Sequence, residues 1–128
     1  MHALNSDRIA ERLAEFGLVT FEAYQAKAQA TALPPPDEIP ALFWWASAVN
    51  GEAGELLEKV KKVYRDHKGE TTPDMYQKIV KEMGDVLWYL SAVASALNIK
   101  LSDVAGYNLA KLQDREQRGV IQGEGDNR

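Results

Sequence analysis

Acidic residues occur in two matched pairs near the middle of the chain. Glu52 and Glu55 form the first pair, and Glu82 and Asp85 form the second pair with the same spacing of three residues. Both pairs share one order of residue types: acid, apolar residue, glycine, acid, apolar residue, leucine. Carboxylates brought close together repel one another and hold protons more tightly unless a cation neutralises them. The pattern therefore predicts a metal site made of these four residues.

The available ligand types indicate which metal such a site would hold. The chain has no cysteine, and its two histidines, His2 and His67, form no metal motif. Carboxylate oxygens without imidazole or thiolate ligands suit Mg²⁺, with Mn²⁺ as a substitute, better than zinc or copper.

Two long helices are predicted to carry the acid pairs. The first runs from near Pro40 to about His67, and the second begins at Pro73 after a capping Thr72. Apolar residues recur at helical intervals in both: Leu42, Trp45, Val49, Ala53, Leu56, Val60 and Val63, then Tyr76, Ile79, Met83, Val86, Leu87, Leu90 and Leu97.

The helical positions of the acids are equivalent in the two helices. At roughly 100° per residue, Glu52 and Glu82 lie about 80° from the centre of their apolar stripe, and Glu55 and Asp85 lie about 140° from it. Antiparallel packing through the stripes would bring all four carboxylates to one rim. The alternative is that each pair belongs to an ordinary solvated helix face.

The remaining elements are predicted to be helical or irregular. Residues 1–19 form a short amphipathic extension with Ile9, Leu13 and Phe16 on one side, ended by Gly17. A helix capped by Thr20 runs to about Ala30 and stops before the prolines at 34–36. A last helix, capped by Ser102, runs to about Arg118, and a glycine-rich tail fills 119–128.

Nothing in the sequence requires a β-sheet. We therefore predict an all-α fold, a compact bundle of four to five helices with one domain at 20–118 between the extension and the tail.

Three glycines interrupt the acidic helices. Gly51, Gly54 and Gly84 each cost roughly 1 kcal/mol relative to alanine inside a helix. A close helix crossing or a ligand phosphate approaching the backbone would compensate this cost.

Composition limits the classes of partner. The chain has 128 residues and a formal charge of −4, which argues against binding of a nucleic acid polymer through a basic surface. No signal peptide and no apolar stretch long enough to cross a membrane is present, so we expect a soluble cytoplasmic protein. A polyanionic ligand would need a metal.

The acidic segments resemble a known family. Residues 51–58 and 81–90 are similar to the motifs of the all-α nucleoside triphosphate pyrophosphohydrolases, which include MazG, dimeric dUTPases and phosphoribosyl-ATP pyrophosphohydrolases. Asn108-x-x-Lys111-Leu112-x-x-Arg115 is similar to a third family element. Many relatives carry a further glutamate directly before the first motif acid, where this chain has Gly51, so the number of metal ions and the general base stay open.

The resemblance implies an activity and roles for named residues. It implies Mg²⁺-dependent cleavage of a nucleoside triphosphate between the α- and β-phosphates, giving a monophosphate and pyrophosphate, and small relatives favour a deoxynucleotide without fixing the base. The four acids would bind the metal, with Glu55 also positioning the attacking water. The candidate substrate-binding residues are Lys59, Tyr89, Asn108, Lys111 and Arg115.

Less specific interpretations of these residues stay open. Lys59 would otherwise be a solvated or ion-paired lysine, Tyr89 a core residue, and Lys111 merely solvent-facing.

Assembly and an alternative function complete the predictions. Trp88 falls opposite the main stripe of its helix, which indicates a second buried face and, with the resemblance, a homodimer or homotetramer. The rival hypothesis is a non-catalytic helical oligomerisation or interaction module. A di-iron bundle is disfavoured because no histidine follows a glutamate at the required spacing.

Overall fold

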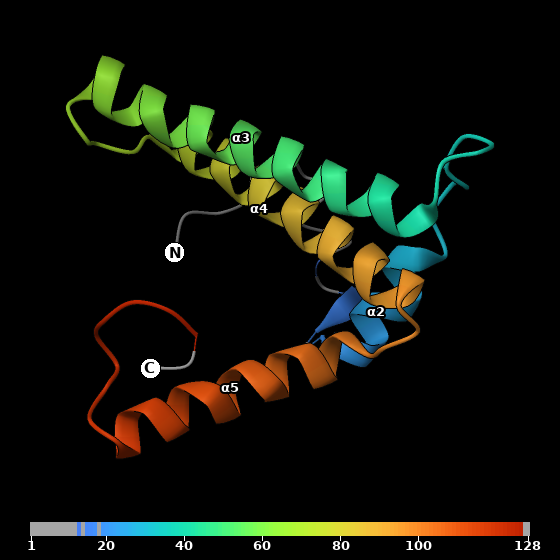
Figure 1. Ribbon diagram of the computed structural model, residues 1–128. Coiled ribbons are helices and arrows are strands. Elements are labelled where there is room, and N and C mark those ends of the chain that lie inside the picture. Colours follow the sequence, from blue (N-terminus) through green and yellow to red (C-terminus); the bar gives the residue numbers. More distant parts are fainter. Residues whose placement is uncertain (1–12, 14, 18, 127–128) are drawn as a thin grey trace.

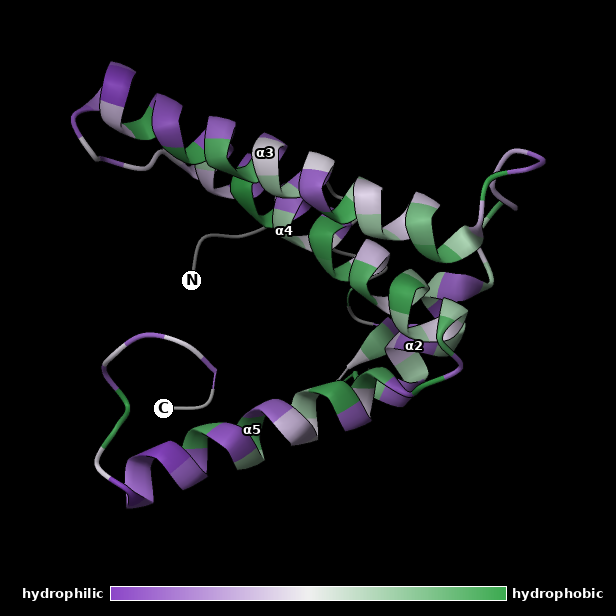
Figure 2. Cartoon of the chain, in the orientation of Figure 1, coloured by the Kyte–Doolittle hydropathy of each residue, from purple (hydrophilic) through white to green (hydrophobic). Residues whose placement is uncertain are grey.

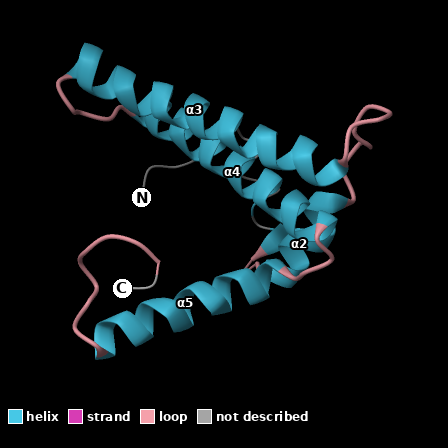
Figure 3. Ribbon diagram, viewed as in Figure 1, coloured by secondary structure: helices cyan, strands magenta, loops and turns pink. Residues whose placement is uncertain are grey.

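The computed structural model describes residue 13 and residues 15–17 and 19–126 of the chain. Its labelled helices are α2 (Phe21–Gln29), α3 (Ala41–His67), α4 (Pro73–Ala96) and α5 (Leu101–Gln117). Figure 3 shows only helices and loops over these residues. The all-α prediction is confirmed.

The predicted boundaries of the two acidic helices are close to those observed. Lys68 ends α3 in the left-handed conformation (φ 54°), and Gly69 follows at φ 87°, so the chain reverses within a few residues. The Thr72 hydroxyl accepts a hydrogen bond from the Met75 N–H, and Pro73 is the first residue of α4. The same cap arrangement, through Thr20, starts α2.

The predicted start of the last helix is wrong by a small margin. Ser102 lies inside α5, and the N-cap residue is Lys100, which makes no side-chain cap. The free N–H of Leu101 instead donates to Gln25 Oε1 of α2 at 2.8 Å. A tertiary hydrogen bond therefore satisfies a backbone group that the sequence assigned to a local cap.

The α3–α4 hairpin is the main packing unit. The two helices run antiparallel along most of their length (Figure 1), and both carry apolar residues along that length (Figure 2). Val63 of α3 and Ala92 and Ala94 of α4 are buried. This packing holds the acidic segments side by side.

Helix α2 crosses the carboxyl-terminal part of α4. Gln29 Nε2 donates to Ser91 Oγ at 2.7 Å, and Gln25 Nε2 donates to Ser95 Oγ at 3.0 Å. Trp88 Nε1 donates to the Ala28 carbonyl at 3.2 Å. The second face of α4 that Trp88 indicated is thus covered by α2 of the same chain, so Trp88 does not by itself argue for a subunit interface.

Helix α5 diverges from the hairpin. It packs against α2 and α4 near their junction but makes no contact with α3 among the described residues (Figure 1). Much of its apolar surface is open, since Tyr107 is 75% exposed and Leu109 is 67% exposed. The fold is therefore more open than a closed bundle.

The amino-terminal extension is described only in part. Ile9 lies outside the described residues, whereas Leu13 and Phe16 are helical and Gly17 follows at φ 55°. Within the described part of the chain, none of the helices has the length and apolar character needed to cross a membrane.

Candidate functional site

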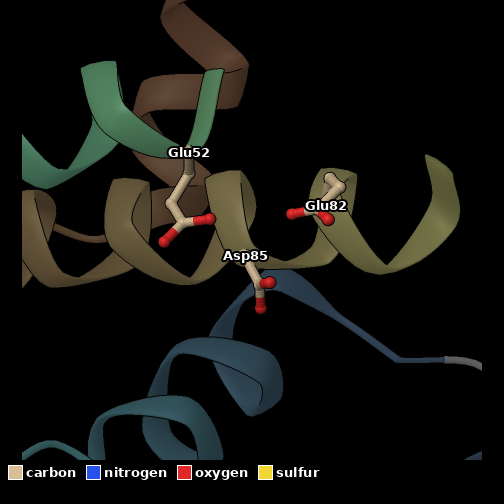
Figure 4. Close-up of side chains that lie close together, drawn as sticks. All are labelled: Glu52, Glu82 and Asp85. Atoms are coloured by element: carbon tan, nitrogen blue, oxygen red, sulfur yellow. The ribbon is translucent and has the colours of Figure 1, made fainter. Parts of the chain in front are cut away.

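Three of the four predicted metal ligands meet on the hairpin. Glu52 comes from α3, and Glu82 and Asp85 lie one turn apart on α4 (Figure 4). One carboxylate oxygen from each residue lies within 4.8 Å of the others. We call these three residues the acidic cluster. Their convergence follows from antiparallel packing of two helices whose acids occupy equivalent edges.

The acidic cluster is electrostatically unfavourable by itself. Partial desolvation raises the pKa of Glu52, and the charges of Asp85, Glu82 and Glu55 raise it further. The pKa of Asp85 is also raised, first by burial and then by Glu82. Desolvation is the larger cause of both shifts, and repulsion from neighbouring carboxylates adds to it; a bound cation would favour the charged forms.

Lys59 supplies a positive charge at the edge of the cluster. Its Nζ lies 3.1 Å from Glu82 Oε1 and 3.6 Å from Glu55 Oε2. These two acids raise the pKa of Lys59, and the hydrogen bond to Glu82 is the largest cause. The structure thus contains the ion pair that was one of the two interpretations of Lys59.

Glu55 lies outside the acidic cluster. Its side chain is 55% exposed, whereas that of Glu82 is 16% exposed. Only the shared contact with Lys59 and the charge that acts on Glu52 connect Glu55 to the three acids. The helical angle does not explain this difference, because Asp85 has the same position relative to the apolar stripe of α4 and still belongs to the acidic cluster.

The helix glycines have no packing explanation within the chain. A Cβ added at Gly51, Gly54 or Gly84 would meet no heavy atom within 4 Å. The expectation of a close helix crossing at these positions is therefore wrong for a single copy. The approach of a ligand to the backbone remains as the alternative.

Aromatic side chains adjoin the acids. Glu52 and Asp85 line an open depression of about 340 Å³ together with Trp88 and Tyr89. The Tyr89 ring lies 4.9 Å from the Trp88 ring and 6.0 Å from the Trp45 ring, measured between centroids. Tyr89 is therefore half-buried, packs against two tryptophan rings and lines the depression.

Tyr24 of α2 was missed from the sequence. Burial raises the pKa of its hydroxyl, and the charge of Asp85 raises it further. Figure 4 shows a ribbon from early in the chain passing beneath Asp85. The only sequence signal was the helical spacing of Tyr24, Ala28 and Thr31, and nothing in that spacing indicates that α2 lies beside the acids.

The three candidates on α5 are not brought to the acidic cluster within one chain. Asn108 is exposed, and Lys111 Nζ lies 3.3 Å from Asp126 Oδ1 in the tail. Arg115 is only 5% exposed and donates through Nη2 to the Asp126 carbonyl at 3.0 Å and to Asp126 Oδ1 at 3.2 Å. The tail therefore already pairs two of the predicted phosphate contacts.

The sequence was compared with known proteins. The pattern of the MazG nucleotide pyrophosphohydrolase domain matches residues 45–120, which is more than half of the chain. The chain belongs to the MazG family. The match includes the acidic cluster, Lys59, Tyr89 and all of α5, whereas α2 with Tyr24 precedes it.

A phage protein is also similar to this MazG-family chain. The Gene 37 protein of Mycobacterium phage L5 is 44% identical over 111 residues, which cover 84% of this chain and 97% of that protein. Its name states no activity. No solved structure gives a significant match.

The donor set fits the metal chemistry expected of the site. Three carboxylates from two rigid helices offer hard oxygen ligands and carry more negative charge than Lys59 neutralises. Such a set suits a divalent cation of the Mg²⁺ type. The arrangement can hold a cation beside an aromatic depression, and that combination fits a phosphorylated aromatic ligand.

Proposed function

We propose that the protein hydrolyses a nucleoside or deoxynucleoside triphosphate at the α–β linkage, using Mg²⁺, and releases a nucleoside monophosphate and pyrophosphate. The observation that carries this proposal is the convergence of Glu52, Glu82 and Asp85 inside the MazG-family match. Mn²⁺ is expected to substitute for Mg²⁺. A deoxynucleotide is the preferred substrate class.

The acidic cluster would hold the cation, and Glu55 would complete its ligands. A divalent cation bound there supplies neutralisation of phosphate charge and a lowered pKa for a water molecule. The raised pKa values of Glu52 and Asp85, caused first by desolvation and then by neighbouring acids, are compatible with this role, because a bound cation would stabilise the charged carboxylates.

Residues around the cluster have separate tasks in the proposal. Glu55 is exposed at the rim and orients the attacking water as its second role. Lys59, held 3.1 Å from Glu82, offers its ammonium group to a phosphate oxygen. Tyr89 forms part of the depression beside Glu52 and contacts the sugar or a phosphate.

A second copy of the chain completes the site. Helix α5 does not contact α3, so Asn108, Lys111 and Arg115 can serve as phosphate contacts only if they act on a neighbouring subunit or if α5 moves. Many apolar side chains on α3 and α5 are exposed in the single chain, among them Leu57, Tyr64 and Tyr107. Burial of this surface favours a homodimer or homotetramer.

The decisive experiment is product analysis in oxygen-18 water. The common ribo- and deoxyribonucleoside triphosphates are incubated with the protein and Mg²⁺. The products are then separated, and their masses are measured by mass spectrometry. Monophosphate plus pyrophosphate is expected, and the label identifies the phosphorus attacked. Diphosphate plus orthophosphate would refute the α–β assignment. Absence of turnover with every nucleotide would favour the non-catalytic interaction module.

A further inference from the structure

An apolar cavity of about 380 Å³ lies between the described residues of 13–19, α2 and α4. Its volume is within the range of about 300–1,000 Å³ that is typical of small-molecule pockets. The residues that form its apolar walls are Leu13, Phe16, Val19, Tyr24, Ala28 and Trp88. We call it the α2 pocket.

The α2 pocket adjoins the depression at the acids. Trp88 lines both, so the two spaces share one wall. Tyr24 lines the α2 pocket, and the charge of Asp85 adds to the effect of burial in raising the pKa of its hydroxyl. A ligand with its phosphates at the acidic cluster would therefore have the α2 pocket within reach of its other end.

The walls of the α2 pocket favour a flat aromatic ligand. Phe16, Tyr24 and Trp88 contribute three aromatic rings, and such rings stack well on planar groups. The nearby polar groups are already paired: Trp88 Nε1 donates to Thr31 Oγ1 at 3.1 Å, and that hydroxyl donates to the Ala28 carbonyl at 2.6 Å. Lys27 Nζ lies 5.7 Å from the Phe16 ring centroid, over the ring.

We propose that the α2 pocket binds the nucleobase of the substrate and recognises it by stacking and shape. This inference rests on the proposed function, because it assumes that the phosphates lie at the acidic cluster. Apart from Trp88, the lining residues precede the stretch that matches the MazG domain. The part of the chain before the matched domain thus determines base binding, while the hairpin carries the chemistry. Because few free hydrogen-bonding groups line the α2 pocket, all four common bases should bind.

The test compares Phe16→Ala with wild type for ligands that have a base and for one that has none. For each of the four deoxynucleoside triphosphates, KM should rise about five- to tenfold, the size expected from loss of one stacking contact. Inorganic tripolyphosphate, used as a competitive inhibitor, should keep its inhibition constant. Leu33→Ala is the control, since Leu33 is 80% exposed and does not line the α2 pocket. It should leave both values unchanged.

A binding measurement separates this inference from the proposed function. Deoxyadenosine and deoxythymidine, without phosphates or metal, should change the tryptophan fluorescence of the wild type, and Phe16→Ala should weaken their binding by a similar factor. If wild type hydrolyses no nucleotide but binds both nucleosides in this way, the α2 pocket stands and the proposed reaction fails.

Three results would overturn the nucleobase assignment. The first is an unchanged KM in Phe16→Ala with an unchanged oligomeric state. The second is an equal rise in KM and in the tripolyphosphate inhibition constant, which would indicate a general structural effect. The third is a smaller oligomer by light scattering with unchanged KM, which would mean that a second copy of the chain covers the α2 pocket.

Discussion

Two charged groups of residues differ in how far nearby opposite charges compensate them. One is the acidic cluster on the hairpin, and the other is the basic pair on α5, Lys111 and Arg115. In the acidic cluster, three like charges converge, and Lys59 approaches only one of the three acids within ion-pair distance. The basic pair is matched by the Asp126 carboxylate and by backbone carbonyls of the tail. Within the described residues, the acidic cluster is only partly compensated by Lys59, whereas the basic pair is largely compensated by the tail.

This difference shows why residue type alone is a poor guide to a binding site. Both sets contain charged residues at helical spacing, and both resembled family elements. The Nε of Arg115 is buried and has no hydrogen-bond partner among the described residues. The other interactions of the basic pair hold the tail against α5. Lys111 and Arg115 could therefore bind a phosphate only if the tail moved away or a neighbouring subunit displaced it.

The strongest test of the comparison is removal of one charge from the acidic cluster. Glu82→Gln is expected to lower kcat/KM for the preferred nucleotide on the order of 100-fold or more, because the reaction loses electrostatic stabilisation of the phosphates. Steady-state kinetics with a pyrophosphate assay measures this. Glu58→Gln on α3 is the matched control, since Glu58 pairs with Lys62 at 3.0 Å and is not in the acidic cluster. Equal activity of Glu82→Gln and wild type would exclude the acidic cluster as the metal site.

Thermal stability gives the next largest expected effect. Mg²⁺ at about 100 times its dissociation constant should raise Tm by about 5 °C or more, since binding to the folded state alone stabilises it. Circular dichroism with and without Mg²⁺ measures the shift. The shift should persist in Glu58→Gln and disappear in Glu82→Gln. If Mg²⁺ does not change the Tm of the wild type, the acidic cluster is an ordinary solvated helix face and does not bind the metal.

Without metal, the acidic cluster should make the folded protein less stable as pH rises, and the sign of this pH dependence can be tested. The folded-state pKa values of Glu52 and Asp85 lie above their ordinary values of 4.5 and 3.8. Their protonated forms therefore stabilise the fold at low pH, and this contribution is lost as pH rises through the raised pKa values. The double variant Glu52→Gln/Asp85→Asn should gain stability relative to wild type as pH increases from acidic to neutral values. Urea unfolding in EDTA across that range measures the difference, and a difference of opposite sign would contradict the predicted repulsion.

Asp126 should show the smallest effect and the opposite sign. Hydrogen bonds and charge from Lys111 and Arg115 lower its pKa below the usual 3.8. Its ionised form therefore stabilises the fold at neutral pH, and this contribution is lost as pH falls through the lowered value. Asp126→Asn should cause a small decrease in Tm at pH 7 that vanishes in strong acid, because exposed ion pairs contribute little. A decrease as large as the Mg²⁺ shift would show that the tail is essential to the fold.

The long helices could be predicted from the sequence because their determinants are local. Thr20, Thr72 and Pro73 define helix starts through groups only a few residues away, and the apolar stripes record which face is buried. Two equivalent acid pairs on antiparallel stripes predicted that all four acids would meet; Glu52, Glu82 and Asp85 do, whereas Glu55 does not. The family resemblance came from the same local patterns, and the MazG-family match confirmed it.

Only the tertiary structure decided which contacts each residue makes with other helices and with the tail. Helix α2 covers Trp88, Gln25 caps α5 in place of Ser102, and the tail pairs with Arg115. It also leaves Glu55 outside the three converging acids and places Tyr24 where burial and the charge of Asp85 raise the pKa of its hydroxyl. These outcomes depend on where α2, α5 and the tail dock, and docking arises from contacts between residues up to 76 positions apart. Helical spacing within one segment contains no information about such contacts, so the sequence determined the helices and their acidic edges, while the docking of the helices determined what surrounds those edges.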